Sequence, residues 1–259
     1  MPRNARQKSE SGIYHIMVRG INRQAIFHDD EDWQKYLETI ARMKKENRFK
    51  LYGFCLMTNH VHLLVQEKEE KISRVMKRIG TSYAWWYNSK YDRTGHLFQG
   101  RYKSEAIDND AYLLSVIRYI HKNPVMARLA QKPEDYRWSS CRVYYGQKEF
   151  PEGLTDTGFI LGLFADNKLE AATRFKRHME AEEQDTCLDN NDDNKGRLGD
   201  LELAAEIKTI LNGEPITALL TMEKKRRNAI LKQIKLMEGY TQRQIARVTG
   251  LNPNIVFRA

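Results

Sequence analysis

The chain contains 259 residues, of which 41% are hydrophobic and 30% are charged. This composition supplies enough apolar side chains for a packed core and excludes a collagen-like or fully disordered chain. No run of about 18 apolar residues occurs, so we expect no membrane-spanning helix, and the polar N-terminus lacks the apolar stretch of a secretory signal. Cys55, Cys141 and Cys187 are odd in number and widely spaced, which fits neither a disulfide framework nor a thiolate metal site. We therefore expect a cytoplasmic protein with one large domain or two small ones.

The charge is unevenly distributed along the chain. Residues 1–150 contain 27 Lys and Arg against 17 Asp and Glu, residues 151–196 contain 5 against 11, and residues 197–259 contain 11 against 6. The net charge of +9 is therefore spread over a basic body, an acidic spacer and a basic tail. Excess positive charge is typical of proteins that bind nucleic-acid phosphates, although a solvated basic surface gives the same count.

The hydrophobic periodicity predicts a strand, a helix, two strands, a helix, a strand and a helix, over residues 13–19, 30–46, 50–57, 60–66, 73–91, 104–107 and 110–122. Acidic residues open the first helix and lysines close it, as the helix dipole prefers. We expect Asn123 and Pro124 to stop the last helix. This order predicts an α+β fold, a ferredoxin-like split βαβ antiparallel sheet with helices on one face.

The rest of the chain predicts a connecting segment and a small all-α C-terminal region. Residues 151–196 form an acidic connecting segment, whose Asn/Asp-rich part over 182–196 is typical of a flexible linker. Helices are predicted over 198–211 and 218–237. Residues 239–259 have the outline of a DNA-binding helix-turn-helix, with Thr241 as the N-cap and Gly250 in the turn. A plain helical hairpin that only packs against the body fits the same pattern.

The segment Asn59 to Val65, NHVHLLV, carries the first chemical signal. On a strand, His60 and His62 project from the same face while Val61 points into the core. Two imidazoles on a rigid backbone supply two of the three ligands that a metal site requires. Most His-X-His pairs on strands are surface or core histidines, so this alternative stays open.

The second signal is RYIHKNPV, residues 118–125. Tyr119 and Asn123 lie four residues apart and share one helix face, whereas His121 points elsewhere and is not counted as a ligand. The Asn123 carbonyl oxygen completes a His-His-Asn set that suits Mg²⁺ or Mn²⁺ better than a closed structural zinc site. In the alternative interpretation, Tyr119 packs in the core and Asn123 only caps the helix.

Together with the segments GIYHIMVRG, FCLMTNHVH, GHLFQGRY and PEDYRWSS, these residues resemble the IS200-like tyrosine transposases of the HUH superfamily, especially the REP-associated branch. The resemblance covers residues 8–145 and implies a ferredoxin-like fold. It also implies that His60 and His62 bind the metal, that Tyr119 is the nucleophile, and that Asn123 is the third ligand. The third ligand varies in type within the family.

The implied activity is that of a metal-dependent single-stranded DNA endonuclease and strand transferase, which forms a 5′-phosphotyrosine intermediate at hairpin or repeat sequences. A phenol has a pKa near 10, so it is a poor nucleophile at neutral pH unless a cation such as Mg²⁺ or Mn²⁺ assists. The expected partner is single-stranded or hairpin DNA, and no membrane partner is expected. We expect the chain to act as a monomer or a homodimer. Two alternatives stay open: a non-catalytic hairpin-binding regulator, and a metal-dependent hydrolase for which Tyr119 is dispensable.

The candidate DNA contacts are basic side chains from three parts of the chain: the helix over 73–91, the segment GRYKSE and the tail. They are Lys77, Arg78, Arg101, Lys103, Arg243 and Arg247. We expect the aromatic residues of the same helix to offer base-stacking surfaces beside a phosphate track. These are Tyr83, Trp85, Trp86 and Tyr87. Core packing of the aromatic rings and solvation of the basic helix faces are the alternatives.

Overall fold

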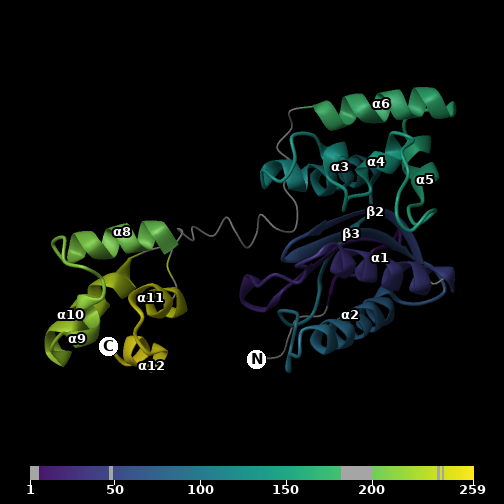
Figure 1. Cartoon of the computed structure of the whole chain (residues 1–259). Helices are drawn as coiled ribbons and strands as arrows, with labels where there is room; N and C mark the ends of the chain where they lie inside the picture. Colours follow the sequence, from purple (N-terminus) through teal and green to yellow (C-terminus); the bar gives the residue numbers. More distant parts are fainter. Residues whose placement is uncertain (1–5, 47–48, 182–199, 238–239, 241) are drawn as a thin grey trace. The chain divides into compact units, whose positions relative to one another are not determined.

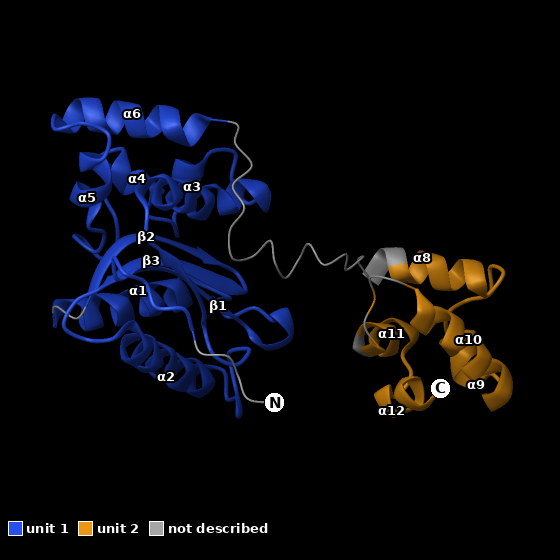
Figure 2. Ribbon diagram, turned by 180° about the vertical axis from the view of Figure 1, so that it is seen from behind, with its two compact units in different colours: residues 1–188 blue, residues 189–259 orange. Residues whose placement is uncertain are grey.

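The computed structural model describes residues 6–46, 49–181, 200–237, 240 and 242–259. The chain divides into two compact units, residues 1–188 and residues 189–259, and each has its own hydrophobic core (Figure 2). The linker predicted over 182–196 lies outside the described residues.

The strands of unit 1 are β1 (Ile13–Arg19), β2 (Phe49–Met57), β3 (His60–Glu67) and β4 (Lys103–Ile107). Its helices are η1 (Ile21–Arg23), α1 (Asp30–Lys45), α2 (Ile72–Lys90), α3 (Asp110–Met126), η2 (Pro133–Asp135), α4 (Cys141–Tyr144), α5 (Thr157–Gly162) and α6 (Lys168–Glu180). The four strands and the helices α1 and α2 lie within one residue of their predicted bounds. The structure therefore confirms the predicted element order.

The four strands form one sheet in the order β2-β3-β1-β4, and all neighbouring strands are antiparallel. This is the arrangement of a split βαβ unit, in which β3 is inserted between β1 and β2. Helices α1 and α2 cover one face of the sheet, as predicted, whereas α3 lies on the opposite face (Figure 1). The predicted α+β fold is confirmed, and α3 adds a second helical layer.

The alternation of side chains along β1 explains the two layers. Tyr14, Ile16 and Val18 pack with the apolar side chains of α1 and α2, while Ile13 packs with the apolar side chains of α3. Successive residues of a strand point to opposite faces, so a strand with apolar residues on both faces must be covered on both sides. The central strands β1 and β3 are thus buried from two directions.

Helix α3 passes through Pro124, where the sequence predicts a stop, and continues to Met126. A proline lacks an N–H donor and its ring crowds the carbonyl four residues earlier, so it is disfavoured in helix interiors, but Pro124 lies in the last turn of α3. The following turn is still closed, because the Ala127 N–H donates to the Asn123 carbonyl at 3.0 Å and the Leu129 N–H donates to the Pro124 carbonyl at 2.8 Å. Asn123 therefore stays inside the helix and keeps its face in common with Tyr119.

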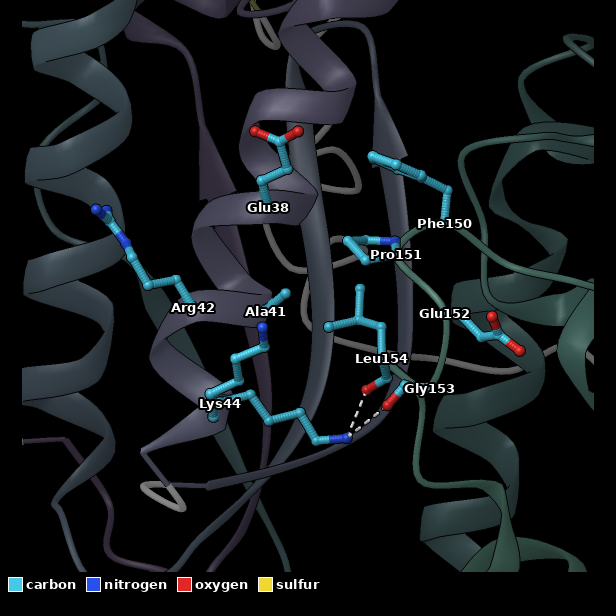
Figure 3. Close-up of a pocket in the computed structure, with 10 residues that line it drawn as sticks. Glu38, Ala41, Arg42, Lys44, Phe150, Pro151, Glu152, Gly153 and Leu154 are labelled. Carbon is cyan, nitrogen blue, oxygen red and sulfur yellow. Dashed lines mark hydrogen bonds between the residues drawn. The ribbon is translucent and has the colours of Figure 1, made fainter.

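Residues 151–181, which the sequence predicts as part of a connecting segment, belong to unit 1. Lys44 of α1 donates hydrogen bonds to the carbonyl oxygens of Gly153 and Leu154 across a groove (Figure 3) and pairs with Asp156 at 2.9 Å. Helices α5 and α6 then bury apolar side chains in the core that α3 forms with the sheet. The predicted boundary at residue 150 is corrected accordingly, because the acidic composition conceals an amphipathic helix over 168–180.

Unit 2 contains α8 (Asp200–Ile210), α9 (Ala218–Thr221), α10 (Lys224–Leu236), α11 (Gln242–Thr249) and α12 (Pro253–Arg258). The helix predicted over 218–237 is divided in two, because Met222 has an extended backbone. Helices α11 and α12 are joined by a short turn in which Gly250 has φ +69°, a conformation that favours glycine. This matches the predicted helix-turn-helix outline, while Thr241 lies outside the described residues.

None of the helices in the described parts of the chain is long and apolar enough to cross a membrane.

Candidate active site

The His-X-His pair lies on the face of the sheet that α3 covers. Directly paired residues of neighbouring strands project to the same side, and His62 pairs with Met17 while His60 pairs with Arg19. Val61 points to the other side and is buried in the core with α1 and α2. The rings of His60 and His62 are 4.9 Å apart and nearly perpendicular. The prediction that the two imidazoles project side by side is confirmed.

Tyr119 of α3 lies directly against this pair. Its ring centroid is 5.7 Å from that of His62, and the two rings meet edge to face at 87°. The tyrosine is 6% exposed, so its ring is held in place by packing. The structure thus brings together two parts of the predicted site that lie 57 residues apart in the sequence.

His15 of β1 is a third histidine of the site, and the sequence interpretation missed it. Its ring lies 5.2 Å from that of His62 and 6.1 Å from that of Tyr119. A hydrogen bond of 3.0 Å joins His15 Nε2 to His62 Nδ1. The available signal was a polar residue among the apolar residues of the predicted strand over 13–19, but that signal does not reveal which strand lies beside β1.

Asn123 is one helical turn beyond Tyr119 and only 7% exposed. Its side-chain nitrogen has no hydrogen-bond partner among the residues that the structure describes. A buried donor without a partner is unusual, but this nitrogen is not the atom that binds a cation; the amide oxygen is. The amide oxygen of Asn123 together with two imidazole nitrogens is a donor set that suits Mg²⁺ or Mn²⁺ with open positions for phosphate oxygens.

The donor set contains no carboxylate or thiolate. Within the described residues, no group of three His, Cys, Asp or Glu side chains is arranged to hold a metal ion. The residues predicted to hold a cation are His60, His62 and Asn123, and this stays a prediction. Nδ1 of His60 is engaged by the Asn59 side-chain oxygen at 2.7 Å, which orients the ring.

His121 lies away from this site, as the helix geometry predicts. It is fully buried, bonded through Nε2 to the Ser140 hydroxyl at 2.8 Å and packed edge-on against Tyr144. Burial lowers the pKa of His121 to about 3. The imidazole is therefore neutral and serves the core between the sheet, α3 and α6.

Two of the predicted DNA contacts lie at one cleft. Lys77 of α2 and Arg101 line a cleft of about 610 Å³ together with Trp85, which is 74% exposed, Phe98 and Tyr102. Exposed aromatic faces beside cations are typical of surfaces that bind single strands. The cleft therefore fits the predicted combination of base stacking and phosphate contact, with Trp85 as its exposed ring.

The other predicted contacts are dispersed. Arg78 pairs with Glu70 at 3.1 Å. Lys103 pairs with Met17 in the sheet, so it projects to the same face as His62. Arg247 is exposed on α11 of unit 2, and Arg243 belongs to the same helix.

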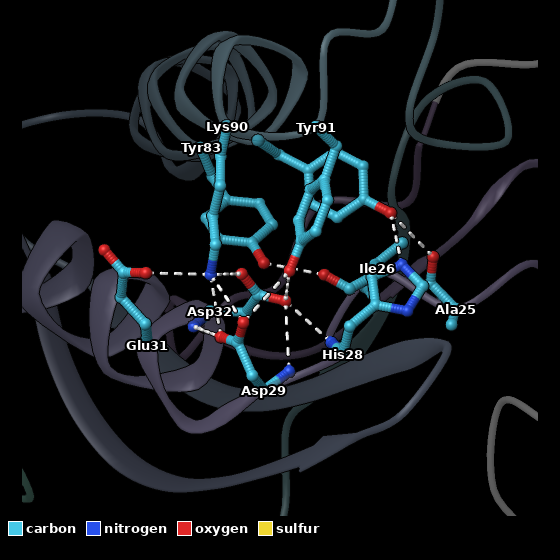
Figure 4. Close-up of polar contacts among 10 residues, drawn as sticks. Ala25, Ile26, His28, Asp29, Glu31, Asp32, Tyr83, Lys90 and Tyr91 are labelled. Atoms are coloured by element: carbon cyan, nitrogen blue, oxygen red, sulfur yellow. Dashed lines mark hydrogen bonds and ion pairs between the residues drawn. The ribbon is translucent and has the colours of Figure 1, made fainter.

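Most of the aromatic cluster of α2 packs in the core instead of stacking bases. Tyr83 and Tyr87 are fully buried, which corrects their expected role as a stacking surface. Lys90 is likewise engaged, with Asp29, Glu31 and Asp32 all within 2.9 Å at the start of α1 (Figure 4). Burial alone would lower the pKa of Lys90, but hydrogen bonds with these carboxylates outweigh burial and raise it. Lys90 therefore ties α1 to α2 and is not part of a phosphate track.

A tyrosine packed against a His-X-His pair on a ferredoxin-like sheet is the arrangement that the resemblance to tyrosine transposases implies. Residues 8–123 match the model of the family described as "Transposase IS200 like". This matched segment contains the whole sheet, His15, His60, His62, Tyr119 and Asn123, so the similarity to IS200-like transposases covers the candidate site.

The solved structures that are similar to this chain include two described as transposases. One is a REP-associated tyrosine transposase bound to a REP hairpin, with 18% sequence identity, a TM-score of 0.49, and coverage of 61% of this chain and 93% of that chain. The other is a protein described as a transposase from Deinococcus radiodurans, with 18% identity, a TM-score of 0.33, and coverage of 47% and 97%. None of the curated proteins matches the chain.

Proposed function

We propose that the protein is a metal-dependent single-stranded DNA endonuclease and strand transferase in which Tyr119 is the nucleophile. The observation that carries this proposal is the packing of the Tyr119 ring 5.7 Å from that of His62, on the sheet face that also presents His60. The family match of residues 8–123 supports it. A protein that only binds DNA has no physical need for this juxtaposition.

In the proposed reaction, the Tyr119 oxygen forms a bond to the phosphorus of a phosphodiester and the phenol gives up its proton. The bond from phosphorus to the 3′ oxygen breaks, and that oxygen takes up a proton to become a free 3′-hydroxyl. The 5′ end stays attached to the protein as a phosphotyrosine, which conserves the energy of the phosphodiester bond. A second 3′-hydroxyl then attacks this intermediate and rejoins the strand without ATP.

His60, His62 and Asn123 would hold the cation for this reaction. When bound, Mg²⁺ or Mn²⁺ supplies Lewis-acid chemistry, because it polarises the scissile phosphate and stabilises negative charge on its oxygens. The contribution of the protein is orientation: β3 fixes both imidazoles on a rigid backbone, and α3 places the phenol and the amide on one face.

The cleft at Lys77, Trp85 and Arg101, on the side of the sheet that α1 and α2 cover, is proposed to bind unpaired DNA. A stacked base contributes about 1–3 kcal/mol without sequence preference, and the basic side chains contact phosphates. Arg243 and Arg247 of unit 2 are proposed to contact the adjoining duplex or stem. A REP hairpin is the ligand of one similar structure, so hairpin DNA is the first substrate to test.

The decisive experiment is incubation of the protein with labelled hairpin DNA that carries single-stranded flanks, in Mn²⁺ or Mg²⁺, followed by denaturing electrophoresis and mass spectrometry. We expect a covalent DNA adduct on Tyr119. The variant Tyr119→Phe should bind the hairpin with unchanged affinity but form no adduct. Tyr112→Phe, the same change on the same helix, is the matched control and should cleave normally.

The outcomes separate the alternatives. Cleavage by Tyr119→Phe would point to attack by water and contradict the assignment of the nucleophile. Tight binding without any adduct by the unmodified protein, across a panel of hairpins, would favour a non-catalytic regulator on the same fold. His60→Ala tests the cation site separately: its affinity for Mn²⁺ should fall in calorimetry, and an unchanged affinity would make the pair structural.

A further inference from the structure

His15 is a buried polar side chain to which the proposed chemistry of Tyr119 assigns no role. Its Nε2 lies 3.0 Å from Nδ1 of His62, and its Nδ1 lies 3.7 Å from a carboxylate oxygen of Glu105 on β4. We infer that His15 is a positioning residue which, under the charge of the neighbouring Glu105, fixes the tautomer of His62 so that Nε2 of His62 is presented to the metal. This inference rests on the proposed function, because it takes His62 as a metal ligand.

The strand register places these three side chains in a chain across the sheet. His15 pairs directly with Glu105 on one side, and its other neighbour strand carries His62 two residues from the partner of His15. Both histidines are fully buried, and their rings stack at 5.2 Å with an interplanar angle of 27°. Tyr119 meets both rings edge to face. The packing therefore leaves the two imidazoles little freedom to rotate. The remaining variable is which ring nitrogen of each imidazole carries the proton.

The Glu105 oxygen, 3.7 Å from Nδ1 of His15, is beyond hydrogen-bond distance and acts on the proton positions through its negative charge. A neutral imidazole carries one proton, on Nδ1 or on Nε2, and an ionised carboxylate only accepts. Glu105 therefore favours the tautomer of His15 with the proton on Nδ1. Nε2 of His15 then carries the lone pair, so it accepts the hydrogen bond from Nδ1 of His62. The lone pair of His62 is consequently on Nε2, the form in which an imidazole binds a metal while its other nitrogen donates.

The opposite proton arrangement is disfavoured by the same groups. If Nε2 of His15 donated to His62, the Nδ1 lone pair of His15 would face the negative oxygen of Glu105 at 3.7 Å. That repulsion is weakly screened, because both imidazoles are buried. His62 would also carry its proton on Nε2, and this nitrogen would then be blocked as a ligand.

His60 shows the same arrangement through a different partner. Its Nδ1 lies 2.7 Å from the side-chain oxygen of Asn59, which only accepts a hydrogen bond. The proton of His60 is therefore on Nδ1 and its lone pair is on Nε2. Two independent contacts thus assign the same tautomer to both members of the pair, as expected where two imidazoles share one cation.

The test begins without any metal. Long-range ¹H–¹⁵N correlation spectra of the full chain at pH 8 distinguish the two neutral tautomers of each histidine. We expect the Nδ1–H form for His62 in the unmodified protein. In Glu105→Ala, a change at a side chain that is 29% exposed, the Nε2–H form of His62 should become populated. An Nε2–H form of His62 in the unmodified protein would overturn the inference whatever the metal does.

Calorimetric titration with Mn²⁺ provides the second measurement. Loss of an orienting partner weakens metal affinity by about 10- to 100-fold, so His15→Gln and Glu105→Ala should raise the Kd for Mn²⁺ by about that factor. His96→Gln, at an exposed histidine outside the pair, is the matched control and should leave the Kd unchanged. An unchanged Kd in both variants, with a loss in His62→Ala, would overturn the role of His15. An unchanged Kd in His62→Ala would instead contradict the metal assignment, and the tautomer spectra would still decide the inference.

Discussion

The buried imidazole of His121 makes the stability of unit 1 depend on pH in a way that can be calculated. Burial lowers its pKa from 6.5 to about 3 in the folded protein. The unfolded chain therefore binds this proton at a higher pH than the folded chain does. The resulting stability is fully present above pH 6.5 and is lost progressively as the pH falls toward 3.

The magnitude follows from the two pKa values. Between pH 7 and pH 5, protonation of the unfolded state at a pKa of 6.5 should cost about 2 kcal/mol of unfolding free energy. With a urea slope of about 2–3 kcal/mol per molar, the midpoint should move by about 0.7–1 M. His121→Gln keeps a polar group for the Ser140 hydroxyl but does not titrate. The stability of this variant should therefore lack the loss of about 2 kcal/mol that His121 causes between pH 7 and pH 5.

Urea unfolding followed by tryptophan fluorescence suits this measurement, because all four tryptophans belong to unit 1. The comparison is between the unmodified protein and His121→Gln at pH 7, 6 and 5, so that contributions from other titrating groups cancel. We expect the two stability curves to converge as the pH falls. Parallel curves would refute the reasoning and show that His121 is not held neutral by burial.

Three further predictions concern packing and DNA binding. A Cβ at Gly53 of β2 would clash with Ile117 Cδ1 of α3, so Gly53→Ala should lower the free energy of unfolding by about 1–3 kcal/mol in urea unfolding. Ile117→Val removes the contacted atom, so the double variant should regain part of this stability, and additive losses of the two variants would contradict the clash. Trp85→Ala should change the free energy of unfolding by less than about 0.5 kcal/mol but weaken single-stranded DNA binding by about 1–3 kcal/mol in fluorescence anisotropy. Unchanged binding would show that Trp85 does not belong to the proposed DNA-binding cleft. Deletion of residues 197–259 should lower hairpin affinity and reduce the salt slope of log K by about 0.9 per lost phosphate contact, whereas an unchanged slope would make unit 2 a packing element.

Much of unit 1 could be predicted from the sequence because its signals are local. Side-chain alternation gives the strands, and the acidic start of α1 appears in the structure as a capping box between Asp29 and Asp32. The shared face of His60 and His62 follows from the strand period alone. Tyr119 and Asn123 follow from the helix period, and the resemblance to a family linked the two pairs.

What the sequence did not reveal depends on contacts between distant segments. His15 and Glu105 enter the site only because β1 lies between β3 and β4. The hydrophobic periodicity of the sequence does not predict this strand order. The three carboxylates that contact Lys90 come from the start of α1, about 60 residues away in the sequence, so the pattern around Lys90 does not reveal them. The segment 168–180 looked like a spacer because its charge concealed Phe175 and Met179, which belong to the core.

The site also depends on the register of one strand. His62 and Val61 are neighbours on β3, and they face α3 and the opposite core respectively. A shift of β3 by a single residue would exchange them, placing an imidazole among the apolar side chains of α1 and α2 and a valine under Tyr119. The same one-residue shift would therefore displace the proposed metal ligands and disrupt the hydrophobic core in one step. The register of β3 that places His62 beside Tyr119 is thus the same register that completes the sheet.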